Sequence, residues 1–315
     1  MMLTLATVYP AHAAQDVEVS VGDGMGSLHG SLLMPDGAAS VPAVLMIAGS
    51  GPTDRNGNST IAGVRPNTLK LLAQGLAAQG IGSLRFDKRG IGASAGAMTA
   101  EGDLRFETYV DDAIAWETFL GAQKRVSCVT ILGHSEGALI GALAAAKTKN
   151  ICGFVSISGA GRSAPDVLAA QLSAQHGGLP QPLLGQALAV IATLKKGQTV
   201  ADPPPQLSAL FRPSAQPYLI SWFAYDPVKA IGSVSAPILI VQGTTDLQVS
   251  VADAKLLAAG HPGAELALLD GVNHVLKSAP PDHAANISTY SEPDLPLAPG
   301  VVTVIADFVN RVSKQ

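Results

Sequence analysis

The segment Gly133-His134-Ser135-Glu136-Gly137 carries the residues best suited to chemistry in this sequence. It follows an apolar run, 126–132, and leads into the alanine-rich segment 138–146, which predicts a buried strand, a sharp turn and a helix. Ser135 lies at the tip of that turn, which is the setting of a nucleophile elbow. The flanking glycines lack a Cβ and leave room for close backbone approach. The segment therefore predicts nucleophilic catalysis by Ser135.

A second Gly-x-Ser-x-Gly match, at residues 92–96, has different surroundings. It follows Asp87-Lys88-Arg89-Gly90 rather than an apolar run, and residues 97–102 behind it show no helical apolar spacing. Because the chain has 33 glycines, a chance match has an expectation of roughly a quarter, and the context must decide. We therefore interpret Ser94 as a loop residue.

An activated serine needs a histidine to take its proton and a carboxylate to orient that histidine. The apolar run 237–241 leads to Asp246, and the run 264–269 leads to His274. Where a serine lies on a strand–turn–helix elbow of this kind, the acid and then the histidine follow it along the chain. We therefore predict Asp246 as the acid and His274 as the base. Asp270 is a rival acid, but it lies in the turn just before His274. The other histidines are interpreted as packing or surface residues.

Two backbone N–H groups should converge on the oxyanion that forms during attack. We predict the N–H of Glu136, directly after the nucleophile, and that of Ser50, in the glycine-rich loop after the apolar run 41–48. The Glu136 carboxylate is expected to cap the helix or form a local salt bridge, with binding of a substrate ammonium as the alternative.

Three residues are candidates for substrate binding. Arg55 either contacts a substrate carboxylate or is a solvated loop residue. Tyr218 and Trp222 belong to an aromatic-rich segment, 218–225, which either lines an acyl pocket or anchors a cap on the core.

Apolar runs that alternate with helical patterns predict an α/β fold with a doubly wound, mostly parallel sheet. Runs that are apolar on both faces indicate strands covered on both sides. The expected strands are 41–48, 126–132, 151–157, 237–241 and 264–269, the expected helices are 68–79, 106–120, 137–147 and 301–312, and an antiparallel hairpin is expected at 16–21 and 27–34.

The alternation breaks at 162–236, which is predicted to be an inserted helical cap or lid over the strand ends. Residues 15–161 and 237–315 then form the core. Residues 1–14 are apolar and end in Ala11-His12-Ala13-Ala14, which resembles a secretory signal without a basic region, so a periplasmic or secreted location is expected over a cytoplasmic one.

Composition narrows the function classes. The net charge of −4 favours neither nucleic acid nor an anionic membrane as a partner, and no apolar run reaches the length of a membrane span. Cys128 and Cys152 are expected to be small core residues, and no metal-binding spacing is present, so neither a metal nor another cofactor is expected. The Gly-x-Gly-x-x-Ala match at 90–95 leaves a dinucleotide-binding oxidoreductase as a weak alternative, and a non-catalytic binding protein is another.

The chain resembles the α/β-hydrolase superfamily, and within it the bacterial carboxylesterases grouped with serine-aminopeptidase-like hydrolases. The resemblance rests on the segments 49–58, 85–94, 133–137, 212–219 and 242–246. It implies cleavage of small-molecule carboxylic esters, of short to medium acyl chain, through an acyl-enzyme intermediate. An aminopeptidase or a thioesterase would use the same residues, and the oligomeric state is not predicted.

Overall fold

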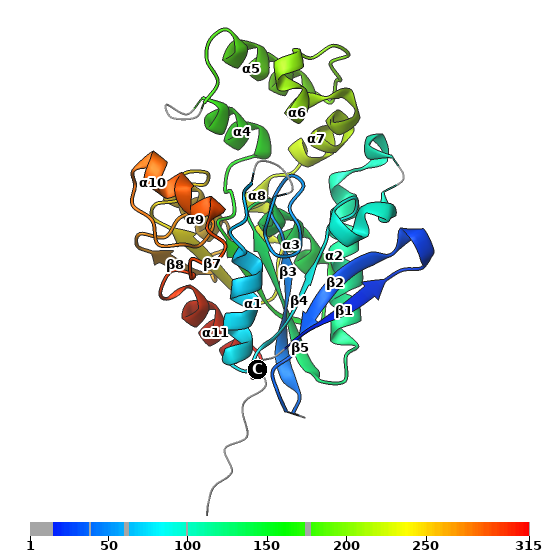
Figure 1. Ribbon diagram of the computed structural model, residues 1–315, viewed down its shortest axis with the longest axis vertical. Coiled ribbons are helices and arrows are strands. Elements are labelled where there is room, and N and C mark those ends of the chain that lie inside the picture. The colour runs from blue at the N-terminus through cyan, green and yellow to red at the C-terminus, as the bar shows by residue number, and fades with distance from the viewer. Residues whose placement is uncertain (1–14, 38, 60–62, 99, 174–177, 315) are drawn as a thin grey trace, which may run out of the picture.

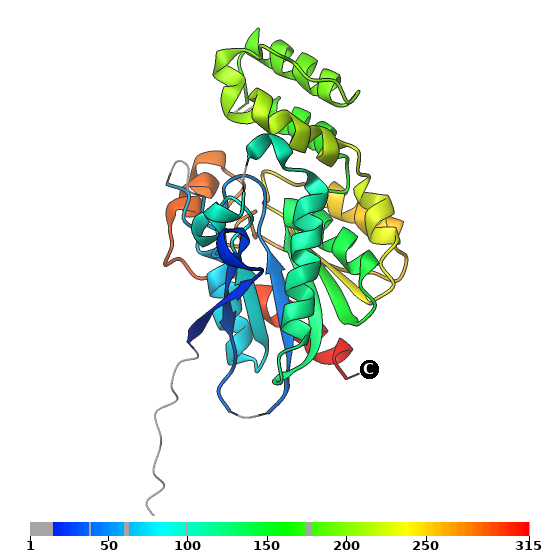
Figure 2. The same ribbon diagram turned by 90° about the vertical axis from the view of Figure 1, so that its right-hand side faces the viewer.

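The computed structural model describes residues 15–37, 39–59, 63–98, 100–173 and 178–314. In these ranges an eight-stranded sheet of order β1-β2-β4-β3-β5-β6-β7-β8 lies between two layers of helices (Figures 1 and 2). Neighbours from β4 to β8 are parallel, whereas β2 is antiparallel to both β1 and β4. The strands are β1 (Asp16–Val21), β2 (Leu28–Leu33), β3 (Val41–Ile47), β4 (Gly82–Phe86), β5 (Val126–His134), β6 (Ile151–Ile157), β7 (Ile238–Gly243) and β8 (Glu265–Leu269).

Helices cover both faces of the sheet. On one face lie α1 (Thr68–Ala78) and α11 (Val301–Val312), and on the other lie α2 (Phe106–Gly121), α3 (Glu136–Lys147), α8 (Pro227–Gly232) and α9 (Val251–Gly260). The central strand β3 alternates between the two layers, since Leu45 packs toward α2 and α3 and Met46 packs toward α1 and α11. Burial on both faces explains why these strands read as continuous apolar runs. Shorter helices are α10 (His283–Ser288) and 3₁₀ turns at Gly24–Gly26, Gly92–Ala97, Glu101–Asp103, Pro205–Leu207, Pro213–Ala215 and Thr289–Ser291.

Two strands differ from the sequence-based expectation. The apolar runs did not include β4, because its five buried residues contain Ser83 and Arg85. Arg85 is fully buried and donates hydrogen bonds to Asp16 and Asn56. The expectation that β8 is covered on both faces is wrong: β8 is the edge strand, and its side chains are exposed or half-buried.

A separate group of helices sits over the carboxyl ends of the parallel strands, at the top of Figures 1 and 2. These helices are α4 (Ala164–Leu172), α5 (Leu183–Leu194), α6 (Ser208–Phe211) and α7 (Gln216–Phe223), and they share a small apolar core of their own. We call them the cap. The predicted insertion 162–236 thus contains the four cap helices together with α8, which packs on α3 and α9 in the main body.

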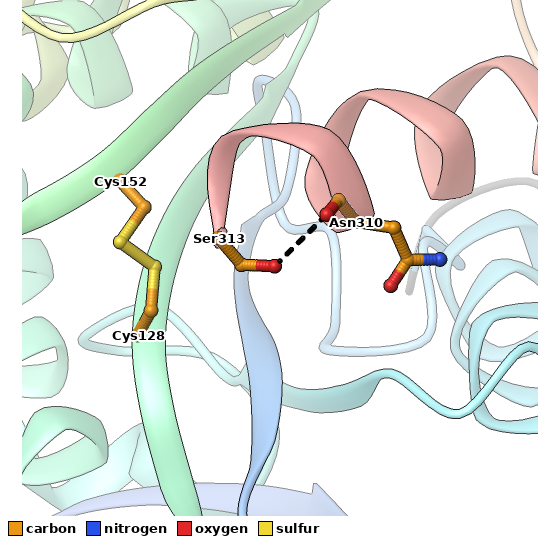
Figure 3. The surroundings of a disulfide bond; sticks show 4 residues. All are labelled: Cys128, Cys152, Asn310 and Ser313. Carbon is orange, nitrogen blue, oxygen red and sulfur yellow. Dashed lines mark hydrogen bonds between the residues drawn. A yellow bond between two sulfur atoms is a disulfide. The ribbon is translucent and has the colours of Figure 1, made fainter. Parts of the chain in front are cut away.

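The two cysteines form a disulfide between neighbouring strands β5 and β6 (Figure 3). The expectation that they are small core residues is therefore wrong, because they are bonded to each other and only half-buried. The pairing of β5 with β6 shifts between Val129 and Thr130, and the Cα atoms of Cys128 and Cys152 lie 6.0 Å apart. This separation is within the usual range for a disulfide. Such a register detail cannot be inferred from two apolar segments.

Residues 1–14, the predicted signal segment, lie outside the described residues. Within the described ranges, no helix combines the length and apolar character that crossing a membrane requires.

We expect the double substitution Cys128→Ser/Cys152→Ser to lower the free energy of unfolding by about 2–4 kcal/mol, because the bond restricts the unfolded chain across its 24-residue separation. Urea unfolding followed by circular dichroism measures the effect. Prior reduction of the unsubstituted protein should lower its stability similarly. Two titratable thiols in the denatured, unreduced protein would contradict the disulfide.

Candidate active site

Ser135 occupies a strained turn between β5 and α3. Its backbone angles are φ 56° and ψ −120°, and its N–H donates to the carbonyl of Ile157 at 2.9 Å. A positive φ is unfavourable for a serine and persists only where the surroundings enforce it. Here they do, because a Cβ on Gly133 would overlap the backbone of Gly137, and a Cβ on Gly137 would overlap the backbone of Ile47 in β3. The two glycines are thus required by packing, as the sequence predicted.

A histidine and a carboxylate meet at the ends of the last two strands. Asp246 follows β7 and His274 follows β8, and His274 Nδ1 lies 2.8 Å from Asp246 Oδ2. The other oxygen of Asp246 accepts the backbone N–H groups of Gln248 and Val249 at 2.8 and 2.9 Å. With Nδ1 bound to the carboxylate, Nε2 is the nitrogen left to exchange a proton.

Electrostatics favour a charged Asp246. Burial by itself would raise the pKa of this carboxyl, but the neighbouring His274 and the hydrogen bonds from His274, Gln248 and Val249 outweigh burial and lower it. Asp246 therefore remains an anion that can stabilise an imidazolium at His274.

The imidazole of His274 lies next to the nucleophile turn. Its ring centroid is 4.8 Å from that of His134, the residue before Ser135, and His134 Nε2 lies 2.8 Å from the carbonyl oxygen of His274. No hydrogen bond joins Ser135 Oγ to His274 among the described residues. Such bonds are often long before substrate binds and tighten in the complex. The arrangement brings the three predicted residues to one edge of the sheet.

The predicted oxyanion donors flank Ser135. Ser50 follows β3 and Glu136 begins α3, and both line the same cavity as Ser135. A Cβ at Gly49 would lie 3.2 Å from Ser135 Cβ, which shows how closely the loop after β3 approaches the turn. Neither the Ser50 nor the Glu136 N–H donates a hydrogen bond within the described part of the chain. Both are therefore free to serve an anion.

A buried cluster beside Ser135 was not expected in this form. Lys88, which follows β4, is 1% exposed, and its Nζ donates to the carbonyl of Gly49 at 2.6 Å and to Glu136 Oε2 at 3.3 Å. Tyr218 of the cap donates its hydroxyl to Glu136 Oε1. Burial and the Glu136 charge raise the pKa of Tyr218, so it stays protonated. The expected local salt bridge of Glu136 is thus present, and both carboxylate oxygens are occupied.

The cavity above Ser135 measures about 620 Å³, and residues of the cap form one of its walls. Tyr218 and Trp222, both predicted substrate-binding residues, line it, and Trp222 stacks on Phe106 with ring centroids 5.9 Å apart. The other lining side chains are largely aliphatic, including Leu139, Val167, Leu168 and Leu219. A volume of this size suits a small molecule.

The arginines at the cavity wall are paired with acids. Arg89 binds Asp112 with a shortest distance of 2.6 Å, Arg162 binds Asp253 at 2.9 Å, and Arg212 binds Glu101 through two nitrogens. The cavity therefore offers little net charge despite its basic side chains.

Arg55 does not line the cavity. The residue is 8% exposed, and its guanidinium contacts Asp87 at 2.8 Å and Glu18 at 2.6 Å and donates to Ser31. Both interpretations from the sequence are therefore wrong: Arg55 is neither a substrate ligand in the cavity nor a solvated loop residue. The residue instead ties its loop to β1, to β2 and to the end of β4.

The two alternative catalytic residues, Ser94 and Asp270, do not contact the Asp246–His274 pair. Ser94 is fully buried, and its Oγ accepts the N–H of His29 at 2.8 Å. Asp270 is exposed and accepts the Thr244 hydroxyl at 2.9 Å rather than His274. Among the described residues, no group of three or more His, Cys, Asp or Glu side chains is arranged to hold a metal ion.

The environment of His134 predicts a pH-dependent stability. Burial, together with the positive charge that His274 can carry, lowers the pKa of His134 to about 4. Because the unfolded chain then binds more protons between about pH 6.5 and 4, stability is full above this window and is lost as pH falls through it, by on the order of 1–3 kcal/mol. Urea unfolding at several pH values should show a smaller loss for His134→Gln. Parallel curves for the two proteins would contradict this assignment.

Comparison with known proteins agrees with this fold. Over 256 residues, 80% of this chain, the sequence is 29% identical to esterase EstD of Thermotoga maritima, and the chain spans 58% of the length of that relative. Est1E from Butyrivibrio proteoclasticus has a similar structure, with a TM-score of 0.61 at 16% identity over 95% of this chain and 99% of that one. The α/β-hydrolase GrgF from Penicillium sp. sh18 gives a TM-score of 0.59 at 20% identity over 96% and 99% of the two chains.

A family model described as serine aminopeptidase, S33, matches residues 67–228, just over half of the chain. The matched segment contains Lys88, Ser135 and Tyr218 and ends before Asp246 and His274. With the fold and the strand-end site as described, the chain belongs to the serine aminopeptidase S33 family of α/β-hydrolases.

Proposed function

We propose that the protein is a serine carboxylesterase that cleaves esters of uncharged acyl groups of short to medium length. The observation that carries the proposal is the His274–Asp246 pair beside the strained turn of Ser135, which itself lines a largely apolar cavity. The similarity to an esterase over most of the chain supports the same activity.

The reaction begins when Ser135 Oγ attacks the ester carbonyl and its proton passes to His274 Nε2. The carbonyl oxygen becomes an oxyanion held by the N–H groups of Ser50 and Glu136. The carbon–oxygen bond to the alcohol then breaks, and His274 returns the proton to the leaving alkoxide. Water, deprotonated by His274, attacks the acyl-enzyme and releases the carboxylic acid and free Ser135.

The charge pattern of the cavity favours esters over aminoacyl substrates. An aminopeptidase needs an acceptor for the substrate ammonium, and two carboxylates line this cavity. Glu136 is held by Lys88 and Tyr218, and Glu101 is held by Arg212 and Ser214. Breaking either set to bind an ammonium would leave a charged partner unpaired. A thioester would meet no such obstacle and shares the acyl-enzyme route.

The dinucleotide alternative is disfavoured by the turn at 90–95. A Cβ on Gly92 would lie 2.6 Å from the Asp87 carboxylate, and that carboxylate already accepts the N–H of Ala93 at 2.9 Å. The turn thus has an anion of its own where a pyrophosphate would bind, and a second anion there would be repelled.

The disulfide between Cys128 and Cys152 supports a periplasmic or secreted location, because such bonds persist in oxidising compartments. A small-molecule ester remains the expected partner, since a cavity of about 620 Å³ beneath the cap has no room for a folded macromolecule.

We expect Ser135→Ala to abolish hydrolysis of p-nitrophenyl butyrate and labelling by a fluorophosphonate, because both reactions need the Ser135 hydroxyl as nucleophile. Ser94→Ala is the matched control and should retain both, provided that its melting temperature shows a folded protein. The reverse pattern would move the nucleophile to Ser94. A folded wild-type protein that neither turns over esters nor reacts with the probe would favour a non-catalytic binding protein.

Asp246→Asn should lower kcat by about 10²–10⁴, because the amide no longer holds the correct imidazole tautomer. Steady-state kinetics with the same ester measure the loss. Asp270→Asn removes a carboxylate from the neighbouring turn without touching His274, so its kcat should stay near that of the wild type. A large loss in the Asp270 variant alone would reassign the acid.

Among p-nitrophenyl esters, kcat/KM should rise with acyl length, because each methylene that is buried contributes about 0.8 kcal/mol of binding free energy. It should fall once the acyl chain is longer than the cavity. Trp222→Ala should move the optimum to longer chains. Phe223→Leu alters the adjacent residue, which packs in the cap core, and should change stability but not the optimum. Since Est1E has been observed with ferulic acid bound, a feruloyl ester belongs in the series. Faster cleavage of an aminoacyl anilide than of the butyrate ester would indicate an aminopeptidase.

A further inference from the structure

Lys88 follows β4, and its side chain reaches two neighbouring segments: the loop after β3 and the start of α3, next to Ser135. Its side chain is 2% exposed, and it contacts the Gly49 carbonyl after β3 and the Glu136 carboxylate after β5. The ring of Tyr109 lies under the ammonium, 5.1 Å from Nζ to the ring centroid. Burying an ammonium is costly unless it is paired and hydrogen-bonded, so these contacts define where the charge must sit.

The contact with Gly49 determines the orientation of a peptide group. The peptide between Gly49 and Ser50 is planar and trans, so its carbonyl and its N–H point in opposite directions. With the carbonyl held 2.6 Å from Lys88 Nζ, the Ser50 N–H is directed away from Lys88. Ser50, Ser135 and Lys88 all line the same cavity.

This peptide needs an external restraint. Glycines flank Ser50 on both sides, and Gly51 has a φ of 72°, so the backbone here can adopt several orientations at small energetic penalty. Rotation of the peptide would replace the N–H donor with a carbonyl oxygen, which repels an oxyanion.

We propose that Lys88 is a positioning residue for the oxyanion site: its ammonium clamps the Gly49–Ser50 peptide so that the Ser50 N–H faces the reacting carbonyl. The hydrogen bond also polarises the peptide, which strengthens the N–H as a donor. Glu136 and Tyr109 hold the charge in place, and Lys88 itself does not touch the substrate. This role rests on the proposed esterase function.

The test is Lys88→Met, which keeps the length of the side chain and removes the donor. We expect kcat for p-nitrophenyl butyrate to fall by about 10–10³-fold, the upper limit being loss of one oxyanion donor. KM should change little, because the ground-state carbonyl depends less on that donor. The affinity for an alkyl trifluoromethyl ketone, which forms an oxyanion on the serine, should fall in parallel with kcat.

Lys88→Met also leaves the Glu136 carboxylate without its cation, and the double variant Lys88→Met/Glu136→Gln removes that charge. If the clamp matters, the double variant stays slow and binds the ketone weakly. Recovery of both values would attribute the loss to the unpaired carboxylate and overturn the proposal. Should the single variant fail to fold, the double variant decides by the same two values.

Lys277→Met is the matched control, because Lys277 is also fully buried and donates to a main-chain carbonyl, that of Leu295. Its affinity for the ketone should match that of the wild type. Equal ketone affinity and kcat in wild type and Lys88→Met would overturn the clamp while leaving the esterase function intact. Absence of ester turnover in the wild-type protein would overturn the proposed function, and the clamp with it.

Discussion

The site depends on a backbone contact that admits no side chain. The turn at Ser135 brings the backbone of β5, the first turn of α3 and the end of β3 so close that a Cβ at Gly133 or Gly137 would overlap neighbouring main-chain atoms. This contact forces Ser135 into its positive φ and turns its side chain out of the sheet edge. It also places the loop after β3 beside the serine. The positions of the proposed nucleophile and of the predicted oxyanion donors thus follow from one packing constraint.

Charge pairing is the second organising feature. Several basic side chains surround the cavity, yet each contacts an acid: Lys88 with Glu136, Arg89 with Asp112, Arg162 with Asp253 and Arg212 with Glu101. These pairs join loops from different strands and the cap, so they orient the walls while leaving an apolar interior. Pairs of this kind contribute little net stability when solvated, but removing one partner of a buried pair is strongly destabilising. Their value here is geometric, because they decide which groups remain free to meet a substrate.

Local sequence patterns predicted the features that depend on the order of strands and helices along the chain. Ser135, Asp246 and His274 could be predicted because parallel strands present their carboxyl ends at one edge of the sheet. The contacts of Lys88 could not, although the motif that contains it was recognised, because its partners lie after β3 and in α3 and only the fold brings them together. The predictions for Arg55 were wrong for the same reason, because its acidic partners, Asp87 and Glu18, are distant from it in sequence. The disulfide depends on a register shift between β5 and β6, which apolar runs do not encode.

The central claim is that Ser135 forms a covalent acyl intermediate. The most direct measurement is mass spectrometry of the protein after rapid acid quenching of its reaction with p-nitrophenyl butyrate, followed by peptide mapping. We expect a mass increase of one butyryl group on the peptide that contains Ser135, and no increase in the Ser135→Ala variant. Steady turnover with the butyryl group on another residue, or undiminished turnover in the Ser135→Ala variant, would contradict an acyl intermediate on Ser135.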